Sequence, residues 1–120
     1  NIKRDNPHIR RNFQPILEKH GVDLVLTGHD HAYGRGVVSD NKDVKPSIVY
    51  VVSVSGPKLY EAGNKNWMQK RGGYLQLFQK ITINGEVLDF KAVTANGEIF
   101  DHFILKKGKS GNKLVEPKIK

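Results

Sequence analysis

The sequence has no cysteine, a single tryptophan, a single methionine and no long hydrophobic stretch. Without cysteine there is no disulfide framework and no thiolate metal site, and cysteine usage gives no indication of an oxidising or a reducing compartment. The longest uninterrupted apolar run, Ile48–Val52, is far too short to cross a bilayer, so we expect no membrane partner. A chain of 120 residues can form one domain with a modest core.

Positive charge dominates the chain, and much of it lies near the C-terminus. The formal net charge is +8, and the segment 106–120 holds six lysines against one glutamate. Such an excess can bind nucleic acid or anionic substrates. Because aromatic residues are not interleaved with these lysines, we instead predict a solvated tail and no nucleic-acid partner. The chain is therefore divided into residues 1–105 and a basic, flexible tail, residues 106–120.

Hydrophobic periodicity predicts a helix near the N-terminus. Its apolar stripe consists of Ile9, Phe13, Ile16 and Leu17. Pro15 interrupts the stripe, so either the helix kinks there or a second short helix begins there. Gly21 is a typical stop signal for this helix.

The second half of the chain has the pattern of a β-meander. Three stretches alternate apolar and polar residues, namely 74–83, 86–95 and 98–105. Asn-Gly pairs at 84–85 and 96–97 are strong hairpin signals between them. A further apolar strand, 48–55, lies upstream and looks covered on both faces. The stretch 56–73 between them has no clear period and is predicted to be a long loop, which is usually functional or mobile.

The stretch 22–35 is the most chemically loaded part of the sequence. Residues 22–26 predict a short central strand of an α/β sheet, and Gly28 ends it. His29 and His31 follow, where such a sheet collects ligands. In extended chain they would point to the same side, roughly 6–7 Å apart along the backbone, with Asp30 pointing away. Two imidazoles so placed can ligate two adjacent metals, although ordinary loop histidines are the alternative interpretation.

The sequence GHDHAYGR at residues 28–35 resembles the GHxHxYxR block of the calcineurin-like metallophosphoesterases. It is closest to the purple acid phosphatase branch, although Gly34 stands where that branch usually has glutamate. Arg10 and the segments 15–17 and 21–26 match the usual lead-in of this block. The family's D-x-H, GDxxD and GNH[DE] motifs do not occur here. We therefore expect this chain to be the C-terminal part of a longer protein.

The resemblance implies roles for particular residues. His29 would ligate one metal of a dinuclear centre and His31 the other. Tyr33 and Arg35 would be supporting or substrate-binding residues in the wall of the site. His8, at the start of the predicted helix, is a further candidate for substrate contact. No catalytic residue is expected within this chain itself.

By resemblance, the fold of the intact protein would be a four-layer α/β/β/α sandwich. This chain would contribute an N-terminal helix, buried strands and the antiparallel meander. Its expected activity is hydrolysis of phosphate esters with two metal ions, which could be iron, zinc or manganese. The chain alone would be metal-free or weakly metal-bound and inactive. In the intact protein the 56–73 loop could help to wall the site.

The expected partners are the missing N-terminal part, a phosphate-ester substrate and, through unpaired strand edges, further copies of this chain. The compartment stays unknown, and the resemblance favours a periplasmic or secreted location. The alternative hypothesis is a non-catalytic β-rich binding or packing module in which the H-x-H pattern is incidental.

Overall fold

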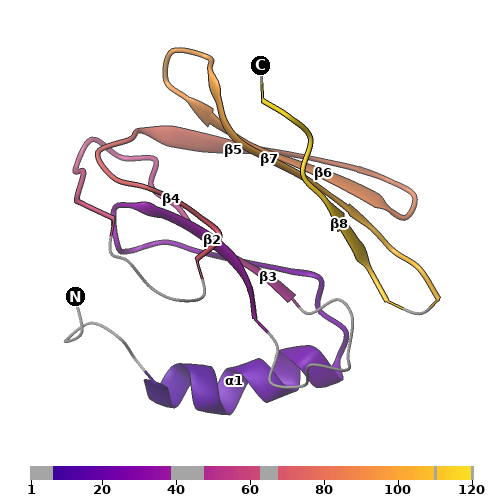
Figure 1. The fold of residues 1–120 in the computed structure, drawn as a ribbon. Helices are drawn as coiled ribbons and strands as arrows, with labels where there is room; N and C mark the ends of the chain where they lie inside the picture. Colours follow the sequence, from indigo (N-terminus) through magenta and orange to yellow (C-terminus); the bar gives the residue numbers. More distant parts are fainter. Residues whose placement is uncertain (1–6, 39–47, 63–67, 110, 120) are drawn as a thin grey trace.

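The computed structural model of the protein describes residues 7–38, 48–62, 68–109 and 111–119. The elements in chain order are α1 (Pro7–Lys19), β1 (Leu24–Thr27), β2 (Tyr33–Val38), β3 (Ile48–Val52), β4 (Lys70–Gly72), β5 (Leu77–Asn84), β6 (Val87–Thr94), β7 (Ile99–Lys106) and β8 (Lys113–Val115). The strands form two stacked sheets, and α1 lies on the outer side of the first (Figure 1). The described chain is therefore a mixed α/β structure in three layers.

The first sheet has the strand order β1-β3-β2-β4. β1 runs parallel to β3, whereas β2 is antiparallel to both β3 and β4. The apolar pattern of residues 22–26 predicted a central strand, but β1 is an edge strand of the described sheet. The carbonyls of Asp23 and Thr27 accept hydrogen bonds from the β3 side. Because strand backbones alternate, the N–H and C=O groups of Leu24 and Leu26 point toward the open edge.

The second sheet has the order β5-β6-β7-β8 and is antiparallel throughout. Its first three strands confirm the predicted meander. Gly85 and Gly97 have φ values of 59° and 89° in the two turns, which is the conformation that favours glycine after asparagine. Local turn chemistry and strict alternation therefore decide this half of the fold.

The C-terminal segment 106–120, predicted to be a basic, flexible tail, contains one short strand. Residues Lys113–Val115 pair with β7 as β8. Two side chains also tie the segment to Asp23, because Asn112 donates to its carboxylate at 2.6 Å and Lys107 lies 3.2 Å from it. Composition did not indicate this short strand, because these contacts join residues far apart in the sequence.

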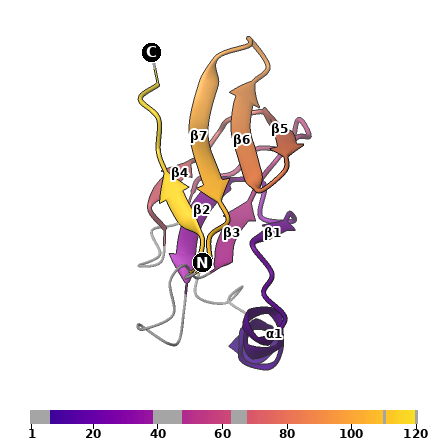
Figure 2. The ribbon, with the colours of Figure 1, turned by 90° about the vertical axis from the view of Figure 1, so that its right-hand side faces the viewer.

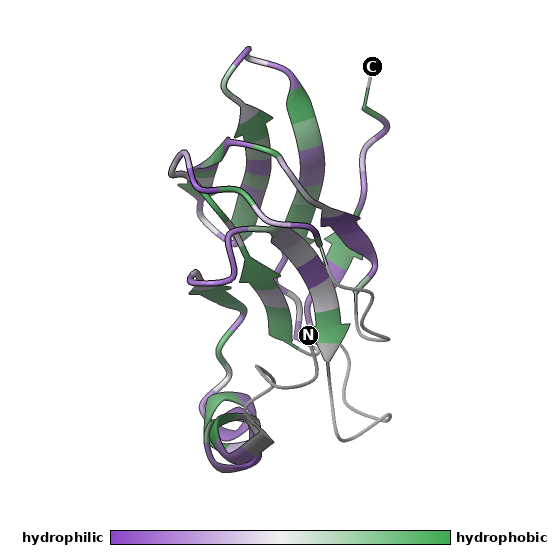
Figure 3. Cartoon of the chain, turned by 90° about the vertical axis from the view of Figure 1, so that its left-hand side faces the viewer, coloured by the Kyte–Doolittle hydropathy of each residue, from purple (hydrophilic) through white to green (hydrophobic). Residues whose placement is uncertain are grey.

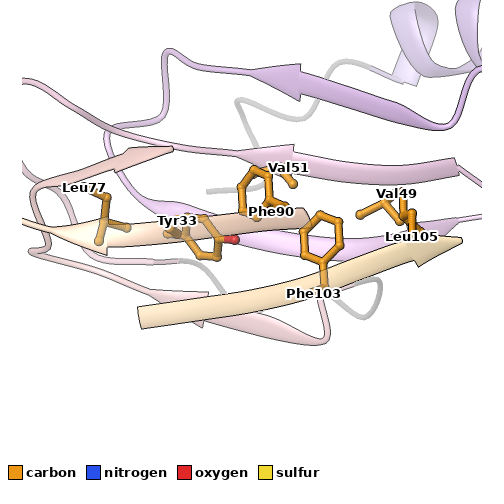
Figure 4. Close-up of a cluster of buried hydrophobic side chains, with 8 residues drawn as sticks. Tyr33, Val49, Val51, Leu77, Phe90, Phe103 and Leu105 are labelled. Atoms are coloured by element: carbon orange, nitrogen blue, oxygen red, sulfur yellow. The ribbon is translucent and has the colours of Figure 1, made fainter. Parts of the chain in front are cut away.

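The core lies between the two sheets (Figure 4). It consists of Tyr33, Val49, Val51, Leu77, Phe90, Ala92, Phe103 and Leu105. The rings of Phe90 and Phe103 stack with their centroids 4.5 Å apart. Apolar and polar residues alternate along strands such as β6 and β7, as the colours of Figure 3 indicate. The strands β2, β3, β5, β6 and β7 supply the apolar side chains of this core.

One side of the sandwich is open. The edge strands β1 and β5 lie on the same side of the two sheets (Figure 2). Leu26 lies opposite buried Val51, and Ile81 lies opposite buried Phe90, so both side chains point to the inner face. They are nevertheless exposed, as is Ile83 at 70 %. Apolar side chains on the inner faces of β1 and β5 are thus left uncovered by the opposite sheet.

Helix α1 is a single helix that runs through Pro15, and Gly21 beyond its end has a φ of 66°. Its apolar stripe is exposed, because Ile9, Phe13 and Ile16 all keep more than half of their surface in contact with solvent. No helix among the described residues is long and apolar enough to span a membrane. An exposed stripe of this kind marks a surface that a further layer of protein could cover.

Candidate metal-ligand loop

Residues 28–32 form an irregular loop between β1 and β2. The loop leaves the carboxyl end of β1, beside the end of the parallel strand β3, as the sequence predicted. His29 has a φ of 82° and His31 a φ of 55°. Left-handed backbone at a residue other than glycine is uncommon and costs about 1–3 kcal/mol. Both histidines are therefore held in conformations that the surrounding structure must support.

This backbone corrects the predicted geometry of the H-x-H pair. The two histidines were expected to project to one side of extended chain. With positive φ at both positions, residues 28–32 are bent instead of extended. The simple two-residue periodicity of a strand therefore does not determine where the imidazoles point.

His31 is fixed by contacts from the loop that follows β3. Its Nδ1 atom lies 2.8 Å from the carbonyl oxygen of Lys58. A carbonyl can only accept, so Nδ1 is the donor in this contact, and in the neutral ring Nε2 then keeps its lone pair. The Tyr60 ring lies 5.0 Å from the imidazole, and the Tyr60 N–H donates to the His31 carbonyl at 3.0 Å. His31 thus presents Nε2 as an acceptor or a metal ligand.

Tyr33 and Arg35 lie in the core, where they meet Asp101 of β7. Tyr33 Oη donates to Asp101 Oδ2 at 2.7 Å. Arg35 donates through Nε at 2.7 Å and through Nη2 at 3.1 Å to the same carboxylate. Arg35 Nη1 also contacts Glu116 at 2.8 Å and Gln69 at 3.2 Å. These contacts link the two sheets and the C-terminal segment. The side chains of Tyr33, Arg35 and Asp101 are buried rather than offered to a ligand.

The surroundings of this cluster favour the neutral form of the Tyr33 phenol and the charged form of the Arg35 guanidinium. Burial, followed by the hydrogen bond to Asp101, raises the pKa of the Tyr33 phenol well above its ordinary value. Burial alone lowers the pKa of Arg35, but hydrogen bonds with Asp101 and Glu116 outweigh it and raise the pKa overall. At neutral pH Tyr33 is therefore a neutral donor and Arg35 a cation.

The other candidates are dispersed. His29 and Asp30 are exposed in the loop, and His8 is exposed on the first turn of α1, a different element. His102 lies on the second sheet, where Nε2 contacts both oxygens of Asp89 at 3.1 and 3.2 Å. The structure therefore brings neither His8 nor His102 into the loop.

Sequence reasoning missed two contributions. It did not connect Lys58 or Tyr60 with His31, because the contact is made through backbone atoms across 27 residues. It also missed Asp101, although a signal was present. Asp101 occupies an inward position of β7, in alternation with Phe103 and Leu105. A carboxylate at an inward-facing position needs a buried partner, and Arg35 supplies it.

No protein-family model, curated protein or solved structure matches the chain. Within the described ranges, no group of three or more His, Cys, Asp or Glu side chains is arranged to hold a metal ion. The chemical interpretation of the loop therefore depends on the two histidines and the atoms that contact them.

Proposed function

We propose that the protein is the C-terminal part of a metal-dependent phosphoesterase in which His29 and His31 each ligate one ion of a dinuclear centre. The observation that carries the proposal is the hydrogen bond from His31 Nδ1 to the Lys58 carbonyl. Metal-ligating histidines almost always donate their second ring N–H in this way, which fixes the tautomer and orients the ring. The left-handed backbone at both histidines adds support, since strained conformations cluster at functional sites.

The donor atoms fit iron, zinc or manganese in kind but not in number. Neutral imidazole suits all three metals, whereas a dinuclear hydrolytic centre also requires carboxylate or amide ligands. The two histidines supply only part of such a set, so the remaining ligands would come from another polypeptide segment. When bound, the metals would stabilise the charge on the transferred phosphoryl group and activate a water molecule. This chain's own contribution is to supply two imidazoles, of which that of His31 is oriented by the Lys58 carbonyl.

The open side of the sandwich supports a larger parent domain. A helix layer and two sheets are already stacked, which is compatible with three layers of a four-layer α/β/β/α sandwich. The exposed inner-face residues Leu26, Ile81 and Ile83 lie where both sheets could continue. The proposed partners are accordingly the N-terminal part of the same protein and a phosphate-ester substrate. By itself this chain is expected to be inactive.

The proposal is tested by titrating the metal-free chain with Zn²⁺ and following the histidine side chains by NMR. Resonances of His29 and His31 should shift first, whereas those of His102 should stay until much higher concentrations. His31→Ala should weaken Zn²⁺ binding, and His102→Ala should not. Equal response of all histidines would contradict the proposal. A phosphatase assay with each metal is the companion experiment, and robust turnover by this chain would mean that no missing ligands are needed.

A second candidate function is a non-catalytic β-rich packing or binding module. It is favoured by one observation, namely that Tyr33 and Arg35 of the motif are buried around Asp101 in the core. In that case the motif would be retained for folding, and the histidines would be incidental. Failure of Zn²⁺ to select His29 and His31 would favour this alternative.

A further inference from the structure

The loop 58–62 contacts both the imidazole ring and the backbone of His31. The Lys58 carbonyl accepts from Nδ1, and the Tyr60 N–H donates to the His31 carbonyl. The Tyr60 ring lies against the imidazole at an interplanar angle of 46°. Three contacts from one short loop therefore determine the rotation of the imidazole ring, its tautomer and the local backbone.

Tyr60 is in turn held from its other side by Tyr74. The Tyr74 N–H donates to the Tyr60 carbonyl at 3.0 Å. Among the described residues, positive φ outside glycine occurs at His29, His31 and Tyr74. Two of these three residues are thus direct hydrogen-bond neighbours of Tyr60. Strained residues persist only where the surrounding structure holds them, so the hydrogen bonds of Tyr60 help to maintain the backbone on both sides.

Gly73 allows loop 58–62 to occupy this position. A Cβ atom at Gly73 would lie 2.5 Å from the Ala62 nitrogen and 3.0 Å from both the Glu61 Cα and the Tyr60 carbonyl oxygen. All three are backbone atoms, so the clash cannot be relieved by rotating a flexible side chain. Any larger residue at position 73 must displace the loop that carries the contacts to His31.

We propose that Tyr60 and Gly73 are positioning residues for the metal-ligand loop. Gly73 seats loop 58–62, and this loop keeps the His31 proton on Nδ1 so that Nε2 faces the ligand. The identity of that ligand as a metal ion rests on the function proposed above. The tautomer and its dependence on the loop are properties of the metal-free chain, so they can be measured independently.

The test compares Gly73→Ala with Gly56→Ala. Gly56 is the matched control because it lies just before loop 58–62, between β3 and β4, and a Cβ there would meet nothing within 4 Å. Long-range ¹H–¹⁵N NMR of the metal-free chain, at a pH where histidine is neutral, reports which ring nitrogen of His31 carries the proton. Wild type and Gly56→Ala should show a protonated Nδ1. Gly73→Ala should shift to the tautomer mixture of an exposed histidine, and its Zn²⁺ affinity should fall roughly 10- to 100-fold.

Two results would overturn the proposal, namely a wild-type His31 protonated on Nε2 or a Gly73→Ala spectrum identical to that of Gly56→Ala. If Gly73→Ala loses its dispersed amide spectrum, Tyr60→Ala and Tyr60→Phe decide instead. Phenylalanine keeps the ring contact and should preserve the His31 signature, whereas alanine should lose it. Because alanine also keeps both backbone hydrogen bonds, the same signature in both variants would refute the role of the Tyr60 ring. Tautomer shifts without Zn²⁺ binding in any variant would leave the positioning role intact and reject the proposed function.

Discussion

The substitution Asp101→Asn tests whether the buried polar cluster holds the two sheets together. Arg35 and Asp101 each expose only 2 % of their surface. The Asp101 carboxylate accepts hydrogen bonds from Tyr33 and, twice, from Arg35. Asparagine preserves the shape of the side chain but removes its negative charge and one acceptor oxygen. The Arg35 cation then remains buried without its nearest counter-charge.

The expected loss can be estimated from this geometry. Removing one partner of a buried ion pair costs about 3–5 kcal/mol, because the remaining charge stays desolvated. Glu116 still lies 2.8 Å from Arg35, but its side chain is 53 % exposed, so water screens much of its field. We therefore expect a loss of about 3 kcal/mol in the free energy of unfolding, out of a typical total of about 5–15 kcal/mol. The melting temperature should fall by about 10 °C.

Urea unfolding followed by circular dichroism measures this loss. Asp89→Asn is the matched control, because Asp89 also accepts from a neighbouring side chain, His102, but on the partly exposed outer face. Its substitution should cost less than about 1 kcal/mol. If Asp101→Asn were no more destabilising than this control, the cluster would not be a main link between the sheets.

Three further predictions concern stability and assembly. Alkaline pH should destabilise the protein, because folding raises the pKa of Tyr33. The contribution of Tyr33 to the free energy of unfolding is present below about pH 10 and falls by up to about 1.4 kcal/mol per pH unit above it. In urea unfolding, Tyr33→Phe should therefore flatten the dependence of stability on pH, whereas substitution of an exposed tyrosine, Tyr74→Phe, should not. Phe103→Ala should cost about 3–5 kcal/mol through loss of a fully buried ring, whereas Ile83→Ala should change stability by less than about 1 kcal/mol; equal losses would mean that the inner face is not packed as described. Leu26→Lys on the open β1 edge should reduce concentration-dependent self-association in light scattering, and a wild-type chain that stays monomeric at all concentrations would count against association through this edge.

Local patterns predicted the second sheet well. Strict alternation and the two Asn-Gly pairs identified β5, β6 and β7 together with their turns. The helix near the N-terminus was also predicted, since its stripe repeats with helical period. These features depend on neighbouring residues, and the physical information for them is contained in short stretches of chain.

The first sheet and the candidate site were predicted less completely. The position of the H-x-H loop beyond β1 was expected, but its bent backbone was not. The roles of Lys58 and Tyr60 were missed because both hydrogen-bond to His31 through backbone groups, the carbonyl of Lys58 and the N–H of Tyr60. The edge position of β1 depends on which strands pair with it, and the apolar sequence of one strand does not indicate its neighbours in the sheet.

By itself, the amino-acid sequence determined the meander, the helix and the presence of two histidines at the end of an apolar strand. Periodicity and turn chemistry act between residues close in the chain, so they can be read without coordinates. The tertiary structure decided that Arg35 and Tyr33 face Asp101, that β8 joins the second sheet and that His31 presents Nε2. Those outcomes depend on desolvation and hydrogen bonds between segments distant in sequence, and such contacts exist only once the chain has folded.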